Sequence, residues 1–384
     1  MIRLTALVAV ALTACGDPPP VELGESKARA LILAPSGVES TNQACVDPAD
    51  YGAIPDDGND DRVAIQTAID SLTKPGTVCL RQGEYLLSRV GGTTGRRWSS
   101  RTREKSGVEL VGVGWSTVLK GMGDGELGDW YMVHVKSPNG VLETKDVAIR
   151  NMRLSGEGMF HTEEQTHLIQ IGLGPVSRVE LSGLSFMHPP RVKSGGGNEG
   201  GGDCIRLLGE YRPAAVPPVD KRVKEIIITR NMFADCDRSS IGIQRAAFNA
   251  TISDSLFVQV GDQHIDMEPT SVGQTGRLTM SNLVLLGGRQ GQLHVTITGN
   301  GDSAIDVFLS NSMLVGRGLG IFQTRGAKLT NNYIEGTGAS QPGLVYIQKA
   351  SELVLISGNT IKRIGTAAGP ALKAIMHNSG MPGR

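Results

Sequence analysis

Eight short segments of the chain share one pattern of apolar and turn-forming residues. In each, an apolar residue is followed five positions later by a second apolar residue, and Asn, Asp or Gly lies between them. From Phe257 to Ile361 the final apolar residues recur every 20 to 29 residues, a period typical of solenoids. The segments are Ile149–Leu154, Leu181–Phe186, Ile228–Phe233, Ile252–Phe257, Met280–Leu285, Leu309–Leu314, Leu329–Ile334 and Ile356–Ile361.

The turn-forming residues of these segments tolerate left-handed backbone and can stack from one coil to the next. We therefore expect them to turn the chain at the same place in successive coils. They are Asn151, Gly183, Asn231, Asp254, Asn282, Asn311, Asn332 and Asn359.

Between these segments lie seven short strands in which apolar and polar residues alternate. Alternation places the apolar residues inward and their neighbours on one outer face. The strands are Leu168–Ile171, Cys204–Leu207, Ile241–Gln244, His264–Glu268, Leu293–Thr296, Gly320–Gln323 and Val345–Gln348. The residues predicted on the outer face are Gln170, Arg206, Gln244, Asp266, Glu268, His294, Gln323 and Gln348. Two insertions, 189–202 and 211–222, are expected to protrude beside Arg206.

The composition agrees with a solenoid and excludes some partners. Aromatic residues are 4% of the 384 residues and glycine accounts for 51, so aliphatic side chains and tight turns must build the core. Lys plus Arg and Asp plus Glu both number 38. This balance gives no field that would steer the chain to nucleic acid, and we expect a monomer.

The N-terminus combines a basic residue, a short apolar run and a cysteine. Arg3 precedes the run 4–12, and Cys15 follows Leu12-Thr13-Ala14. A run this short cannot span a bilayer. The pattern resembles a bacterial lipoprotein signal, which implies a signal peptide at 1–14, acylation of Cys15, and export; the alternative is an ordinary signal peptide. Asp17 lies second after the cysteine, which favours the outer membrane. Residues 15–44 are expected to form a flexible tether.

Four further cysteines allow two disulfides with three possible connectivities. We favour Cys45 with Cys79 and Cys204 with Cys236, because each pair can lie on neighbouring coils; free buried thiols are the alternative. No C-x-x-C spacing occurs, so a metal site built on thiolates is not expected.

Residues 50–88 carry a signature that indicates the fold family. They contain Asp50-Tyr51-Gly52-Ala53, the acidic turn 56–61, an amphipathic stretch, then 76–80 and 83–87; the run 110–119 follows. This region resembles the start of the pectate-lyase-like superfamily of polygalacturonases, rhamnogalacturonases and phage tailspikes. The resemblance implies an all-β, right-handed parallel β-helix over residues 45–384, with a short N-terminal helix covering its open end. The residues at helical spacing for that helix are Val63, Ile65, Ala68, Ile69 and Leu72. In this family the acidic turn is architectural.

The densest ionisable patch lies on the strand 264–268 and its neighbouring coils. We predict catalytic roles for Asp203, Arg206, His264, Asp266, Glu268 and His294, and substrate-binding roles for Gln170, Gln244, Arg245 and Asp262. Two carboxylates can serve as general acid and general base in glycoside hydrolysis. Alternatively, a histidine or Arg206 can abstract the proton α to a uronate carboxyl, as in a lyase. Solvated surface residues without a catalytic role are the third interpretation.

Several features limit what the resemblance implies. The aspartate and histidine motifs of polygalacturonases are absent, so pectin is not supported as the substrate. No cofactor is expected; calcium is the alternative, although no calcium motif is present. The set His161, Glu163, Glu164 and His167 fits no common metal spacing. A basic run at 96–105 either grips an anionic glycan or is a solvated loop. The leading function is an exported polysaccharide hydrolase or lyase; a non-catalytic glycan-binding or scaffold lipoprotein is the alternative.

Overall fold

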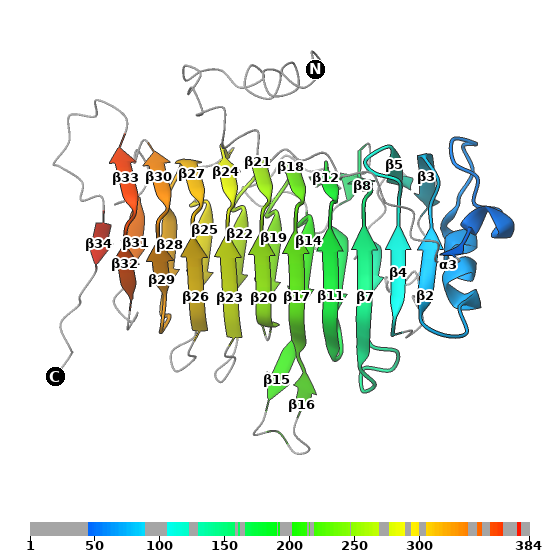
Figure 1. Cartoon of the computed structure of the whole chain (residues 1–384), viewed down its shortest axis with the longest axis horizontal. Helices are drawn as coiled ribbons and strands as arrows, with labels where there is room; N and C mark the ends of the chain where they lie inside the picture. Colours follow the sequence, from blue (N-terminus) through cyan, green and yellow to red (C-terminus); the bar gives the residue numbers. More distant parts are fainter. Residues whose placement is uncertain are drawn as a thin grey trace, which may run out of the picture. The chain divides into compact units, whose positions relative to one another are not determined.

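The structure is a computed structural model. It describes residues 45–88, 106–122, 130–157, 160–161, 166–189, 191–192, 202–212, 215, 219–245, 247–268, 276–288, 293–298, 305–336, 344–347, 354–363 and 375–377. All of these residues belong to one compact unit, Pro35–Arg384. No helix among them is long and apolar enough to cross a membrane. Strands dominate the unit, and they stack coil after coil (Figure 1).

Three long parallel sheets form the walls of a right-handed parallel β-helix, as the sequence predicted. Sheet A has eleven strands and sheet B has ten. Sheet A contains β1 (Cys45–Val46), β2 (Gly76–Cys79), β4 (Val108–Val111), β7 (Thr144–Arg150), β11 (Val176–Ser182), β17 (Val223–Thr229), β20 (Ala247–Ser253), β23 (Gly276–Ser281), β26 (Ile305–Ser310), β29 (Lys328–Thr330) and β32 (Leu355–Ser357). Sheet B contains β3 (Gly83–Ser88), β5 (Thr117–Met122), β8 (Arg153–Ser155), β12 (Ser185–Met187), β18 (Met232–Cys236), β21 (Leu256–Val260), β24 (Val284–Leu286), β27 (Met313–Gly316), β30 (Tyr333–Gly336) and β33 (Thr360–Arg363).

Sheet C has nine strands and contains the alternating strands predicted above. They are β6 (Trp130–Val135), β10 (Thr166–Gly172), β14 (Ile205–Leu208), β19 (Ile241–Gln244), β22 (Ile265–Glu268), β25 (Val295–Thr298), β28 (Leu319–Phe322), β31 (Val345–Ile347) and β34 (Ile375–His377). Two small sheets pair β9 (Phe160–His161) with β13 (Arg191–Val192) and β15 (Glu210–Arg212) with β16 (Val219–Lys221). The antiparallel pair β15–β16 protrudes from the coils, in the second predicted insertion (Figure 1).

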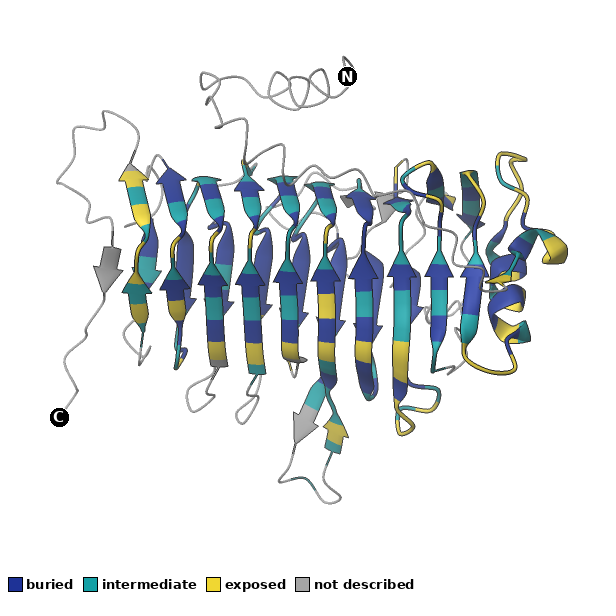
Figure 2. Cartoon of the chain, viewed as in Figure 1, coloured by how far each residue is buried: buried dark blue, intermediate teal, exposed yellow. Residues whose placement is uncertain are grey.

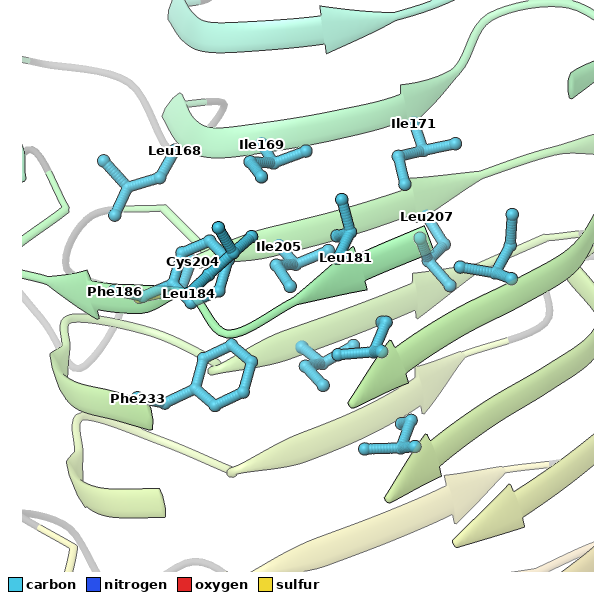
Figure 3. Packing of buried hydrophobic residues seen from close by; sticks show 14 of the residues in the cluster. Leu168, Ile169, Ile171, Leu181, Leu184, Phe186, Cys204, Ile205, Leu207 and Phe233 are labelled. Atoms are coloured by element: carbon cyan, nitrogen blue, oxygen red, sulfur yellow. The ribbon is translucent and has the colours of Figure 1, made fainter. Parts of the chain in front are cut away.

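The interior between the sheets is a continuous apolar core. Figure 3 shows Ile169 and Ile171 of β10 beside Ile205 and Leu207 of β14, and all four are fully buried. Figure 2 shows buried residues along the strands of successive coils. Aromatic rings stack through the core with centroids 4.8 Å and 4.6 Å apart, from Phe186 through Phe233 to Phe257. Such stacking adds to the stabilisation by area burial.

The corner between sheets A and B has the predicted left-handed residue in five of the eight coils. Asn151, Gly183, Asp254, Asn282 and Asn311 all have positive φ between 50° and 65°. For the remaining three coils the prediction was one residue late. There the left-handed residues are Arg230, Asn331 and Gly358.

In those three coils the predicted asparagine has a different role. The buried side chain of Asn231 accepts a hydrogen bond from Leu184 N at 2.8 Å and donates one to Leu181 O at 3.0 Å. Asn332 and Asn359 likewise donate to backbone carbonyls of the preceding coil, at 2.9 Å and 2.8 Å. These amides satisfy backbone groups that the corner would otherwise leave without partners.

The N-terminal end is covered by η1 (Pro48–Tyr51) and α3 (Arg62–Ser71), as the resemblance implied. Ile65, Ala68 and Ile69 of α3 are buried, whereas Val63 is 57% exposed, so its placement on the apolar face was wrong. The acidic turn is architectural. Its carboxylates accept hydrogen bonds of 2.9 Å from alternate backbone N–H groups of β3, at Glu84, Leu86 and Ser88. These bonds satisfy donors at the exposed end of sheet B.

Both predicted disulfides are present. The N-terminal disulfide joins Cys45 to Cys79, and the central disulfide joins Cys204 to Cys236. Each links neighbouring coils. The signal peptide, Cys15, the tether, the basic run 96–105, the glutamates at 163 and 164, and Gln348 lie outside the described residues.

Candidate active site on the outer face of sheet C

The outer face of sheet C carries a row of aligned residues, one from each of the eight strands from β6 to β31. Strand register places them opposite one another on neighbouring strands, about 4.8 Å apart. This central row is His134, Gln170, Arg206, Gly242, Asp266, Thr296, Gly320 and Tyr346. The prediction that Gln170, Arg206 and Asp266 share one face is therefore confirmed, although all three are buried.

Asp203, which lies just before β14, contacts the central row of the next coil. A Cβ atom on Gly242 would lie 2.6 Å from Oδ2 of Asp203, so the carboxyl of Asp203 occupies the space outside Gly242. In the preceding coil, Nε2 of His167 lies 3.0 Å from Nη1 of Arg206, and Nδ1 of His167 accepts a 3.0 Å bond from Asp203 N. His167 thus connects the guanidinium to the segment that carries Asp203.

Four carboxyl groups meet at this point and form what we call the acidic cluster: Asp203, Asp262, Asp266 and Glu268. Asp203 reaches the rung of Gly242, one rung from Asp266. Glu268 follows two residues after Asp266, so both side chains leave the same face of β22. Asp203 and Asp266 are 1% and 5% exposed. The Oδ1 atoms of Asp262 and Asp266 are buried without a hydrogen-bond partner.

Basic and amide groups surround the acidic cluster. Nη2 of Arg238 lies 3.8 Å from Oε2 of Glu268. Gln244 donates to Glu268 Oε2 at 3.4 Å and accepts a hydrogen bond from Arg206. Oδ1 of Asp203 accepts a 3.3 Å bond from Ser239 N. The predicted substrate-binding residue Gln244 therefore bridges Arg206 and Glu268.

Burial raises the pKa values of three carboxyls in the cluster, and repulsion by neighbouring carboxylates contributes for Asp262 and Asp266. Burial, followed by the charges of Glu268, Asp203 and Asp262, raises the pKa of Asp266 to about 8 against the opposing attraction of Arg238. Burial also raises the pKa of Asp262 to about 6. The pKa of Asp203 is raised by burial, although Arg238 and Arg206 oppose this. At neutral pH Asp266 therefore retains its proton, which makes it a candidate general acid.

The prediction that His264 and His294 lie on the outer face was wrong. Both side chains are buried in the interior, where their rings stack 5.1 Å apart and His264 contacts the core ring of Phe257. Nε2 of His294 lies 2.9 Å from Val315 O, and Nε2 of His264 lies 3.3 Å from Leu286 O. Burial lowers the pKa of His294 to about 4 and that of His264 well below its usual value. These rings extend the phenylalanine stack and do not face a substrate.

Other predicted residues differ in where they lie. Arg245 is exposed in a left-handed turn after β19. Gln323 occupies a left-handed position after β28, and the outward residues of that strand are Gly320 and Phe322. Gln170 is fully buried, and both amide atoms lack a hydrogen-bond partner. Sequence reasoning missed Arg238, whose position before a strand gives it no place in the alternation.

The described residues contain no group of three His, Cys, Asp or Glu side chains arranged to hold a metal ion. The N-terminal third of the chain matches one family of proteins. Residues 46–172 match the sequence model of the family described as rhamnogalacturonase A/epimerase, pectate lyase-like. The match covers a third of the chain and confirms the resemblance predicted from residues 50–88 and 110–119.

The chain is also similar to several solved structures. The chain is 17% identical to the catalytic unit of an α-1,3-glucanase from Streptomyces thermodiastaticus, with a TM-score of 0.51; the match covers 83% of this chain and 54% of the glucanase. The chain is 17% identical to the A-module of a mannuronan C-5 epimerase from Azotobacter vinelandii, with a TM-score of 0.47. This match covers 83% of this chain and 88% of the A-module. The chain is also 13% identical to an endo-xylogalacturonan hydrolase from Aspergillus tubingensis, with a TM-score of 0.46. This match covers 88% of this chain and 100% of the hydrolase. No curated protein sequence matches the chain. At these identities the likeness shows the fold alone.

Proposed function

We propose that the protein is a carbohydrate-active enzyme that hydrolyses a polysaccharide bound along the outer face of sheet C. The observation that carries the proposal is the acidic cluster, in which the buried Asp266 retains a proton beside other carboxyl groups. A protonated and an ionised carboxyl on one face are the two groups that glycoside hydrolysis requires. The family match and the glucanase with the same fold agree with this class of substrate.

The geometry favours Asp266 as general acid and Glu268 as general base. Their side chains leave the same face of β22 two residues apart, and we propose that they act together in the one-step reaction of inverting enzymes. Glu268 is also accessible, because its side chain is 47% exposed. In the reaction, water attacks the anomeric carbon and gives a proton to Glu268. The glycosidic C–O bond breaks, and the proton of Asp266 passes to the leaving oxygen.

The test incubates the protein with a panel of neutral and uronic polysaccharides. It measures new reducing ends, the ultraviolet absorbance of unsaturated products and, by NMR, the anomeric configuration of the first product. We expect reducing ends without absorbance, inverted configuration, and a loss of at least 100-fold in kcat for Asp266→Asn. Asp306→Asn, on the exposed face of sheet A, serves as the control. Full activity of Asp266→Asn would refute the assignment.

A lyase reaction is the second candidate, and the guanidinium of Arg206 in the central row, linked through Gln244 to Glu268, favours it. A base beside a guanidinium can remove the proton α to a uronate carboxyl while the positive charge stabilises the enolate. In that case products from uronic polysaccharides absorb in the ultraviolet, and Arg206→Gln abolishes the absorbance. The absence of products from the whole panel, together with retained binding, would support a glycan-binding scaffold instead.

We also propose that the protein is exported and anchored to the outer membrane by acylated Cys15. The support is the sequence alone, Leu12-Thr13-Ala14-Cys15 after a short apolar run. Labelled palmitate should be incorporated into the wild-type protein in bacteria. Cys15→Ser should incorporate none and should leave the membrane fraction.

A further inference from the structure

An aromatic pair lies on the outer face of sheet C, beyond the acidic cluster. Phe322 of β28 and Tyr346 of β31 have ring centroids 5.4 Å apart and planes inclined by 52°. Both side chains are half-buried, unlike the rings of the core stack. They lie on neighbouring strands of one sheet, so they form a continuous apolar surface.

Gly320 lets the ring of Phe322 lie directly on the strand. A Cβ atom on Gly320 would be 2.4 Å from Cε2 of Phe322 and 2.6 Å from Cδ1 of Leu293. Any larger residue would therefore push the ring away. Leu293 of the preceding coil is buried against the same rung. Glycine within a strand weakens the strand, and here it allows a flat apolar surface at a position that faces outward.

The aromatic pair is aligned with the acidic cluster. Strand register runs from Asp266 through Thr296 and Gly320 to Tyr346, one residue per coil. Gly320 is two rungs from Asp266, or about 10 Å. A linear polymer lying along this row at the acidic cluster would reach the aromatic pair.

We propose that Phe322 and Tyr346 form a stacking subsite for a pyranose ring of the bound polysaccharide. The proposal rests on the proposed function for the nature of the ligand. Aromatic rings bind the apolar C–H face of a sugar, whereas polar groups fix its hydroxyls. The polysaccharide then contacts apolar rings on the C-terminal side of the acidic cluster. On the other side it contacts the polar groups of Arg206 and Gln244.

The experiment measures binding separately from cleavage. Affinity electrophoresis of Asp266→Asn, the background intended to block cleavage, is run through gels containing polygalacturonate, alginate, xylan, laminarin or dextran. Phe322→Ala is then added to this background. We expect at least one polysaccharide to retard the parent, and the dissociation constant to rise roughly three- to tenfold on loss of the ring.

The matched control is Phe308→Ala, because Phe308 is also half-buried but lies on sheet A. It should leave retardation unchanged. Equal retardation of Phe322→Ala and its parent, or no retardation of the parent in any gel, would overturn the subsite. Gly320→Ala provides a second variant that moves the ring without removing it, and it should weaken binding as well. Binding that needs Phe322 in a protein that cleaves nothing would retain the subsite and refute the hydrolase.

Discussion

Replacement of Asp266 by asparagine should remove activity and stabilise the protein. The pKa of Asp266 is raised from 3.8 to about 8, whereas the unfolded chain ionises this group normally. The folded protein therefore holds a proton that the unfolded chain releases between these pH values. Each pKa unit corresponds to about 1.4 kcal/mol, so at pH 7 the wild type loses on the order of 2–4 kcal/mol of unfolding free energy that the neutral amide retains.

The pH dependence is the sharpest part of this prediction. The stability gained by keeping Asp266 protonated is fully present below pH 3.8 and is lost as the pH rises through 8. The Tm difference between Asp266→Asn and wild type should therefore be small at pH 4, grow to about 4–8 °C near pH 8, and then remain constant. Scanning calorimetry or fluorescence measures it, with Asp306→Asn as the control. A difference that is independent of pH, or a less stable variant at pH 8, would refute the reasoning.

Three further predictions follow from other parts of the site and core. Gly242→Ala places a methyl group where the carboxyl of Asp203 lies, 2.6 Å from Oδ2, so kcat should fall by at least tenfold while Tm changes little; unchanged kcat would contradict the placement. Removal of either disulfide by a double serine substitution should cost about 3–4 kcal/mol of unfolding free energy, because the closed loops are similar in length. Only loss of the central disulfide should also lower kcat, since it adjoins the acidic cluster. The pKa of His294 is lowered to about 4 from 6.5, so its stabilising effect is lost as the pH falls through this range. His294→Phe should therefore lose less Tm than wild type between pH 6.5 and 4, and parallel curves would contradict this.

Much of the fold was predictable because it repeats. An apolar pair five residues apart, with a left-handed residue between, describes a local geometry that each coil needs. The sequence therefore predicted the corner at Asn151 and at Asp254 without knowledge of the neighbouring coils. Where two candidate residues were adjacent, as at Asn331 and Asn332, composition gave no means of choosing between left-handed backbone and buried amide.

The candidate site was predicted less well, for a reason that lies in the corner before sheet C. There, two consecutive residues face the interior, as His264 and Ile265 do, so strict alternation fails by one position. For this reason both histidines, His264 and His294, were wrongly predicted to face outward. It also left His167, which lies before the break, out of the predicted outer face. Only the packing of neighbouring coils determines where alternation begins.

The acidic cluster and the aromatic pair each depend on a glycine of sheet C. Gly242 makes space for the carboxyl of Asp203, and Gly320 makes space for the ring of Phe322. Glycine lowers the stability of a strand, and buried carboxyls with raised pKa values lower it further at neutral pH. The residues that lower the stability lie on the outer face of sheet C, and Gly242, Asp266 and Gly320 all belong to the central row. A cluster of residues that lower the stability of the fold is typical of a functional site. The cluster therefore supports the proposal that one ligand contacts both the acidic cluster and the aromatic pair.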